Sequence, residues 1–104
     1  APTGGQIFKM ATEGSARLLG RNDLGKIAVG MAGDLFMINA DKLELTCALS
    51  DHKAFLSTVG NKGNADYTVV NGQIVVKDGH LTMADEEKLV SRANECWEKY
   101  MNLN

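Results

Sequence analysis

The sequence lacks the residues and runs that mark several large classes of protein. Its 104 residues contain one proline, Pro2, and two cysteines, and aromatic side chains make up only 6%. No run approaches the roughly 18 apolar residues of a membrane span, and the amino terminus has no basic segment followed by an apolar one, as a signal peptide would have. We therefore expect no membrane partner.

An excess of charge of one sign is also missing. Eleven Lys and Arg residues face 13 Asp and Glu residues, so the formal net charge is -2. Without a basic stripe to neutralise phosphates, nucleic acid is not an expected partner. Two cysteines without paired spacing, Cys47 and Cys96, together with five methionines indicate free thiols in a reducing compartment, so we expect a cytoplasmic location.

Paired metal ligands are absent as well. Zinc ligands commonly come in close pairs such as C-x-x-C or H-x-H, and neither spacing occurs. The remaining candidates for a thiolate–imidazole pair or a metal site are Cys47, His52 and His80. The plainer interpretation is a buried Cys47, surface histidines and a Cys96 in the core. We therefore expect no catalytic, cofactor-binding or metal-binding residue in this chain.

Two further patterns imitate functional motifs. "GRNDLGKI", residues 20–27, nearly matches the phosphate-binding loop, but Ile27 stands where a hydroxyl is required and the predicted order is helix, loop, strand. Its glycines are better explained as a helix end and a turn. Asp85, Glu86 and Glu87 are consecutive, so they do not face one another on a helix. We expect them to form a solvated first turn that favours the helix dipole.

The clearest pattern that is present is a β-hairpin, "YTVVNGQIVVKDGHL", residues 67–81. Asn71-Gly72 supplies the two positive-φ positions of a type I′ turn, and Asp78-Gly79 turns the chain again. A short apolar run at residues 34–39 predicts a further strand. We therefore expect an antiparallel sheet of at least three strands.

Three helical segments complete the prediction of an α+β fold. Residues 85–101 carry one apolar stripe at helical spacing, and this helix is expected to pack on the sheet. Near the amino terminus we expect either two short helices broken near Thr12 or one kinked helix, ending at Gly20. A short helix should run to about residue 59, with Ser50 or Asp51 as its N-cap.

Four segments of the sequence follow one another in order: M-A-T-x-x-x-A-x-x-L-G (residues 10–20), G-x-I-x-x-G (25–30), G-D-L-x-x-I-N (33–39) and V-N-G-x-x-V-V-x-D-G-x-L (70–81). Together they resemble the carboxy-terminal end of the metal-dependent amidohydrolase superfamily. Residues 40–60 and 85–100 look most similar to the aminohydrolase branch, which includes chlorohydrolases, guanine deaminases and cytosine deaminase-like enzymes, and within it to 8-oxoguanine deaminase. Two departures are Gly33, where relatives usually have Ala, and "SDHK" at residues 50–53, which leaves a role for His52 open. We expect Gly33 to loosen the start of its strand slightly.

The resemblance implies a role for each part of the chain. Residues 1–24 would be helices associated with a (β/α)8 barrel, and residues 25–104 would form a small composite β-sandwich with a carboxy-terminal helix. The barrel of the parent enzyme would bind zinc or iron through an H-x-H pair upstream of Ala1 and hydrolyse a C–N bond on a purine, pyrimidine or triazine-like ring. No residue of this chain inherits a catalytic role.

Three functional hypotheses follow. The chain is a structural, non-catalytic fragment of such an enzyme; or it is a free-standing binding or oligomerisation module; or it is an enzyme that uses Cys47 or the histidines. The fragment hypothesis predicts the parent barrel as partner. It also predicts a homo-oligomer through the amino-terminal helices, with Phe8 and Leu19, or through a sheet edge, because both would otherwise stay uncovered.

Overall fold

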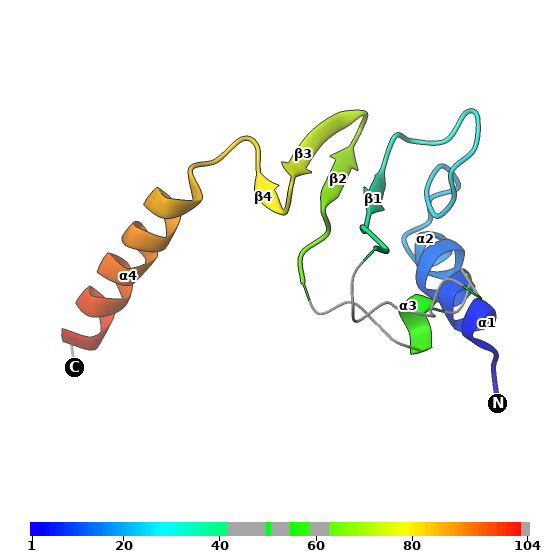
Figure 1. Cartoon of the computed structure of the whole chain (residues 1–104), viewed down its shortest axis with the longest axis horizontal. Helices are drawn as coiled ribbons and strands as arrows, with labels where there is room; N and C mark the ends of the chain where they lie inside the picture. The colour runs from blue at the N-terminus through cyan, green and yellow to red at the C-terminus, as the bar shows by residue number, and fades with distance from the viewer. Residues whose placement is uncertain (42–49, 51–54, 59–62, 103–104) are drawn as a thin grey trace.

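The computed structural model describes residues 1–41, 50, 55–58 and 63–102 (Figure 1). A four-stranded sheet lies between helical segments from the two ends of the chain (Figure 1). Within the described residues, no helix is both long enough and apolar enough to cross a membrane. The elements are, in order, α1 (Gly4–Lys9), η1 (Met10–Gly14), α2 (Ser15–Leu18), β1 (Leu35–Met37), α3 (Phe55–Thr58), β2 (Tyr67–Val70), β3 (Gln73–Lys77), β4 (His80–Leu81) and α4 (Glu86–Asn102).

The amino-terminal elements α1, η1 and α2 form one uninterrupted helical stretch. Thr3 begins it with a capping box: its hydroxyl accepts the Gln6 N–H at 3.2 Å, and the Gln6 side chain accepts the Thr3 N–H at 2.8 Å. The expected break near Thr12 is wrong, because η1 is a π-helical turn and the Thr12 hydroxyl donates back to the Phe8 carbonyl at 2.9 Å. The other alternative, one helix rather than two, therefore agrees with the structure, and the irregularity in it is the π-helical turn η1.

Gly20 ends this helix as predicted. Its φ of 72° is left-handed, and its N–H donates to the Arg17 carbonyl at 2.9 Å, while the Arg21 N–H donates to the Ala16 carbonyl at 3.0 Å. These two bonds make a Schellman motif, which satisfies carbonyls that the last helical turn leaves without partners. The chain can then turn back along the helix.

The sheet confirms the predicted antiparallel hairpin. Its strand order is β1-β2-β3-β4 with every pair antiparallel, and Val70 pairs with Gln73 across the first turn. Asn71 and Gly72 have φ values of 50° and 77°, as a type I′ turn requires. Asp78-Gly79 makes a second positive-φ turn into β4, a strand that the sequence analysis did not predict.

Residues just before β1 hold the hairpin turn in place. The Gly33 carbonyl accepts the Gly72 N–H at 2.9 Å, and the Asp34 carboxylate accepts the Asn71 N–H at 2.7 Å. A Cβ on residue 33 would lie 2.9 Å from the Gly72 nitrogen. Gly33 thus permits a close approach of two backbones, and the expectation that it loosens the start of the strand stays a prediction.

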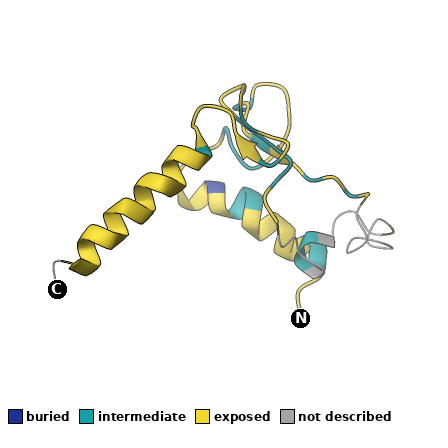
Figure 2. Ribbon diagram, turned by 60° about the vertical axis from the view of Figure 1, so that its left-hand side comes forward, coloured by how far each residue is buried: buried dark blue, intermediate teal, exposed yellow. Residues whose placement is uncertain are grey.

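The predicted packing of the last helix on the sheet is also wrong. Helix α4 forms over the expected residues, but none of them is buried, and Figure 2 shows α4 leading away from the sheet. Glu86, in its first turn, contacts His80 and Leu81 of β4. Cys96, expected in the core, is consequently exposed.

Helix α3 lies against α1, and the Ser57 hydroxyl donates to the Gly4 carbonyl at 3.1 Å. The helix predicted up to about residue 59 is thus confirmed at Phe55–Thr58. The predicted cap at Asp51 lies outside the described residues. The proposed division into residues 1–24 and 25–104 stays a prediction.

The chain as a whole is open. Its radius of gyration is 17.9 Å, whereas a compact domain of this length would have about 13 Å. Its accessible surface is 8496 Å², against roughly 5,700 Å² for a compact monomer of this mass. Among the described hydrophobic residues, only Ala16 is buried. The apolar faces of this chain are therefore left without a common core.

Candidate functional site

In the described part of the chain, an apolar groove lies between the amino-terminal helix and strand β1. Its volume is about 1100 Å³, and it is lined by α1, η1, α2, the loop at residues 24–27, β1 and Leu56 of α3. Strand β1 is an edge of the described sheet, so the groove runs beside unpaired backbone groups. The apolar side chains that line it include Phe8, Ala11, Leu19, Ile27, Leu35 and Phe36.

Gly25 fixes one wall of this groove. Its φ is 98°, and a Cβ on it would lie 2.9 Å from the Glu13 Cα and 3.0 Å from the Thr12 carbonyl oxygen. The loop after the helix therefore lies directly on the π-helical turn. A side chain at residue 25 would push the loop away and widen the groove.

The polar groups around the groove do not form a catalytic set. Lys9 and Glu13 make an exposed ion pair at 3.8 Å along the helix surface, which contributes little. A groove with mainly apolar walls is suited to packing against another protein surface rather than to acid–base chemistry.

The segment that nearly matches a phosphate-binding loop, residues 20–27, ends the helix and forms a turn, as predicted. Arg21 and Asp23 form a forked ion pair after Gly20, with the Arg21 Nη2 2.6 Å and Nε 2.9 Å from the Asp23 carboxylate oxygens. The hydrogen bond from Arg21 lowers the pKa of Asp23, and the same bond raises the pKa of Arg21. The guanidinium is thus engaged by its neighbour rather than presented to a phosphate.

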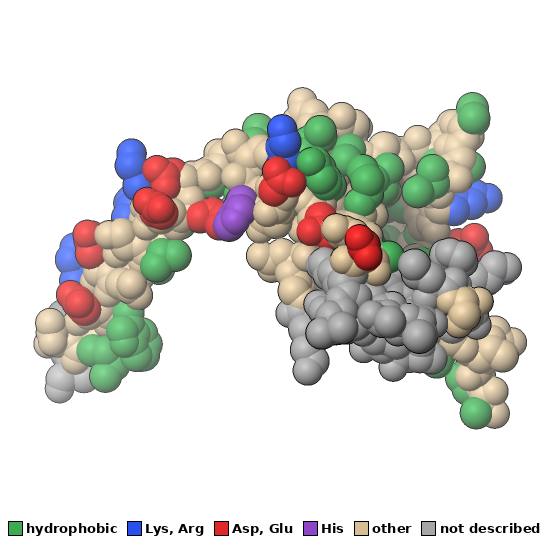
Figure 3. Space-filling model, in the orientation of Figure 1, with side chains coloured by type: hydrophobic (Ala, Val, Ile, Leu, Met, Phe, Trp, Pro, Cys, Tyr) green, Lys and Arg blue, Asp and Glu red, His purple; other side chains and the backbone are tan. Residues whose placement is uncertain are grey.

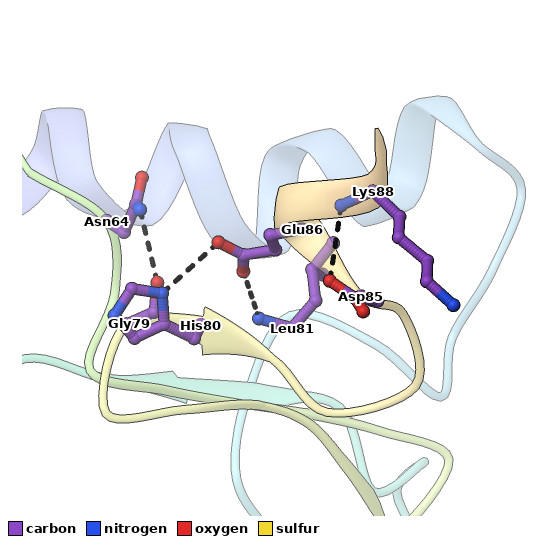
Figure 4. A network of polar contacts seen from close by, with 7 residues as sticks. All are labelled: Asn64, Gly79, His80, Leu81, Asp85, Glu86 and Lys88. Carbon is purple, nitrogen blue, oxygen red and sulfur yellow. Dashed lines mark hydrogen bonds and ion pairs between the residues drawn. The ribbon is translucent and has the colours of Figure 1, made fainter. Parts of the chain in front are cut away.

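A second group of polar contacts joins β4 to the start of α4 (Figure 4). The Glu86 carboxylate accepts the Leu81 N–H, and its Oε2 lies 3.2 Å from the His80 Nδ1. The hydrogen bond from Leu81, followed by that from His80, lowers the pKa of Glu86. Asp85 caps the helix by accepting the Lys88 N–H at 3.2 Å.

Glu86 and Glu87 lie in the first turn of α4, as expected, and the network adds a second role for one of them. Glu86 is not simply a solvated residue that favours the dipole, because it ties α4 to β4. The sequence carries no signal that would reveal a carboxylate returning to a strand five residues earlier. The His80 and Glu86 side chains are exposed, so this network is suited to positioning the helix rather than to enclosing a substrate.

The structure describes only some of the other candidate residues. Cys47 and His52 lie outside the described residues, His80 lies on β4, and Cys96 is exposed on α4. In the part of the chain that the structure describes, no three His, Cys, Asp or Glu side chains gather as metal ligands. The described residues therefore do not fit a zinc or iron site, and the absence of such a site from the whole chain stays a prediction.

Comparison with known proteins identifies close relatives. A model of the amidohydrolase family matches residues 3–76. Hydroxydechloroatrazine ethylaminohydrolase from Pseudomonas sp. (strain ADP) is 38% identical over 88 residues, which are 85% of this chain and 18% of the relative. The 8-oxoguanine deaminase of Pseudomonas aeruginosa is 37% identical over 82 residues, 79% of this chain and 18% of the relative.

Solved structures agree with these sequences. Atrazine chlorohydrolase TrzN from Arthrobacter aurescens TC1, solved in complex with zinc, has a TM-score of 0.80 and 32% identity, over 89% of this chain and 20% of that one. The chain thus spans about a fifth of the length of these relatives. Together with the family match, the shared arrangement of helix and sheet shows that this chain belongs to the amidohydrolase family.

Proposed function

We propose that this chain is the carboxy-terminal portion of a metal-dependent amidohydrolase that hydrolyses a C–N bond on a purine, pyrimidine or triazine-like ring. The observation that carries the proposal is the family match over residues 3–76. The names of the relatives, an ethylaminohydrolase and several deaminases, share the hydrolytic removal of an amine.

In this proposal the segment itself is structural. Its apolar groove of about 1100 Å³ provides a surface on which a barrel domain would pack, and its hairpin would form part of a small composite β-sandwich beside that barrel. A bound zinc or iron ion would activate water for attack on the ring carbon. Its ligands would come from the barrel, because the described residues offer no set of ligands.

The test begins with the coding sequence upstream of Ala1. We expect an open frame that encodes an H-x-H pair and barrel strands. The protein made from that whole frame should hold a tightly bound metal ion and release ammonia from 8-oxoguanine or S-adenosylhomocysteine, or an alkylamine from a hydroxylated alkylaminotriazine. An in-frame stop codon directly upstream would contradict the proposal and favour a free-standing module.

A control separates this proposal from catalysis by the segment. The 104-residue chain alone should bind no stoichiometric zinc or iron and release no amine from the same substrates. Tight binding of one ion, lost in Cys47→Ser or His52→Ala, would show that the segment has a metal site of its own.

A further inference from the structure

The turn between β2 and β3 contains the dipeptide in which asparagine deamidates most readily. In Asn-Gly, the backbone nitrogen of the glycine can attack the side-chain carbonyl carbon of the asparagine, because glycine has no side chain to obstruct the approach. Asn71-Gly72 is the only such pair in the sequence, and Asn71 is exposed. The turn itself lies at the upper edge of the molecule in Figure 1 and Figure 3.

Two residues just before β1 hold both backbone amides of this turn. The Asp34 carboxylate accepts the Asn71 N–H at 2.7 Å, and the Gly33 carbonyl accepts the Gly72 N–H at 2.9 Å. To attack, the Gly72 nitrogen must give up its proton and turn towards the Asn71 side chain. A Gly72 N–H that donates to Gly33 can do neither, so these bonds oppose the reaction.

The protecting segment is placed where a sheet opens easily. Strand β1 has only three residues and is an edge of the described sheet, paired with β2 alone. Short edge elements with exposed hydrogen bonds open locally at a lower free-energy cost than the centre of a fold. Opening of residues 33–34 would therefore release the Gly72 nitrogen without unfolding the hairpin.

We propose that Asn71 is a site of spontaneous deamidation whose rate is set by the opening of residues 33–34. In the open state the Gly72 nitrogen loses its proton to water and bonds to the Asn71 Cγ, which closes a succinimide ring. The Cγ–Nδ2 bond breaks, and the side-chain nitrogen takes up a proton and leaves as ammonia. Water then opens the ring and leaves aspartate or isoaspartate. The inference does not depend on the proposed enzymatic function.

The products would make the opening permanent. Isoaspartate adds one atom to the backbone, and a two-residue type I′ turn has no place for it. Either product also carries a carboxylate close to that of Asp34, and like charges at short distance repel each other. The modified turn would hold residues 33–34 less tightly, and with them the strand β1 that lines the groove. The site thus records past opening of that strand.

Peptide mapping by mass spectrometry tests the protection. In mildly alkaline buffer, residue 71 of the folded chain should deamidate at least about tenfold more slowly than in the same chain unfolded in urea. Asp34→Ala removes the acceptor for the Asn71 N–H and should raise the folded-state rate about fivefold. Asp34→Asn keeps an acceptor oxygen and should raise it less.

Gly33→Ala provides a second variant that leaves Asp34 in place. Its Cβ would lie 2.9 Å from the Gly72 nitrogen, so it should push the segment away from the turn and raise the rate as well. Circular dichroism shows whether each variant retains its helices.

Asp78-Gly79 is an internal control. It forms the same succinimide with loss of water, and its Gly79 N–H donates to the Asp66 carbonyl at 3.1 Å, away from residues 33–34. Its conversion to isoaspartate should not change in Asp34→Ala. Equal rates at Asn71 in the folded and unfolded chain, no rise in either Asp34→Ala or Gly33→Ala, or an equal rise at Asp78 would each overturn the proposal.

Discussion

At the scale of single residues, Gly25 has the most demanding position. Its φ of 98° and its distances of 2.9 Å and 3.0 Å from a built Cβ to the backbone of Glu13 and Thr12 leave no room for a side chain. Gly30 offers a comparison, because it has a similar φ of 86° but no atom within 4 Å of its Cβ position.

We expect Gly25→Ala to destabilise the chain more than Gly30→Ala. Both changes cost about 1–2 kcal/mol for the left-handed backbone, and Gly25→Ala adds about 1–3 kcal/mol of overlap with the π-helical turn. Urea unfolding followed by circular dichroism measures the difference. Equal effects of the two changes would show that the loop does not lie on the helix.

Glu86 predicts a dependence on pH at the start of α4. The Leu81 N–H, then His80, lowers the pKa of this carboxyl below its ordinary 4.5, so its hydrogen bond to Leu81 is present above that value. The bond is lost as pH falls through the lower folded-state pKa.

The measurement is the Leu81 amide proton shift in an NMR titration. We expect an inflection below pH 4.5 in the wild-type chain and its loss in Glu86→Gln. Glu87→Gln removes the same charge from the same turn and should leave the inflection unchanged. An inflection at or above the ordinary value would contradict the contact.

At the scale of elements, the beginning of the amino-terminal helix depends on one hydroxyl. The Thr3 side chain accepts the Gln6 N–H, so Thr3→Ala should destabilise the helix by about 1 kcal/mol. Thr3→Ser keeps the oxygen and should lose little. Helix content by circular dichroism and the urea midpoint of both variants test this, and equal midpoints would rule out the cap.

The same elements show what the sequence could predict. The turn at Asn71-Gly72 and the helix end at Gly20 were predictable, because each depends on backbone preferences of one or two neighbouring residues. The capping box was also predictable, because Thr3 is followed three residues later by Gln6.

Other features depend on contacts that no local pattern encodes. Gly25 lies on Thr12 and Glu13 because the chain reverses between them, and Glu86 returns to Leu81 across a turn. The apolar stripe of α4 predicted that a face would be covered, yet it carried no information on what covers it. The expectations of packing on the sheet and of a buried Cys96 were therefore wrong.

At the scale of the whole molecule, the proposed function predicts that a barrel domain covers the groove beside β1. Phe8 lines it, whereas Val29 is fully exposed on the loop. If a barrel domain packs on the groove, Phe8→Asp in the protein made from the whole reading frame places a charge in a dry interface.

We expect Phe8→Asp to destabilise that full-length protein by about 3 kcal/mol or more and to lower its melting temperature and soluble yield. Val29→Asp adds the same charge at an exposed site and should have little effect. Differential scanning calorimetry compares the two variants. Indistinguishable melting temperatures would show that the groove stays open in the full-length protein.

The attachment of α4 through its first turn also has a mechanical consequence. A helix of 17 residues held at Glu86 acts as a lever about 25 Å long. A rotation of only about 10° at that point would carry its far end through about 4 Å. Small changes at the turn between β3 and β4 would thus be amplified at Trp97 and Tyr100. A spin label on Cys96 would report them as a change in its distance from a second label on the sheet.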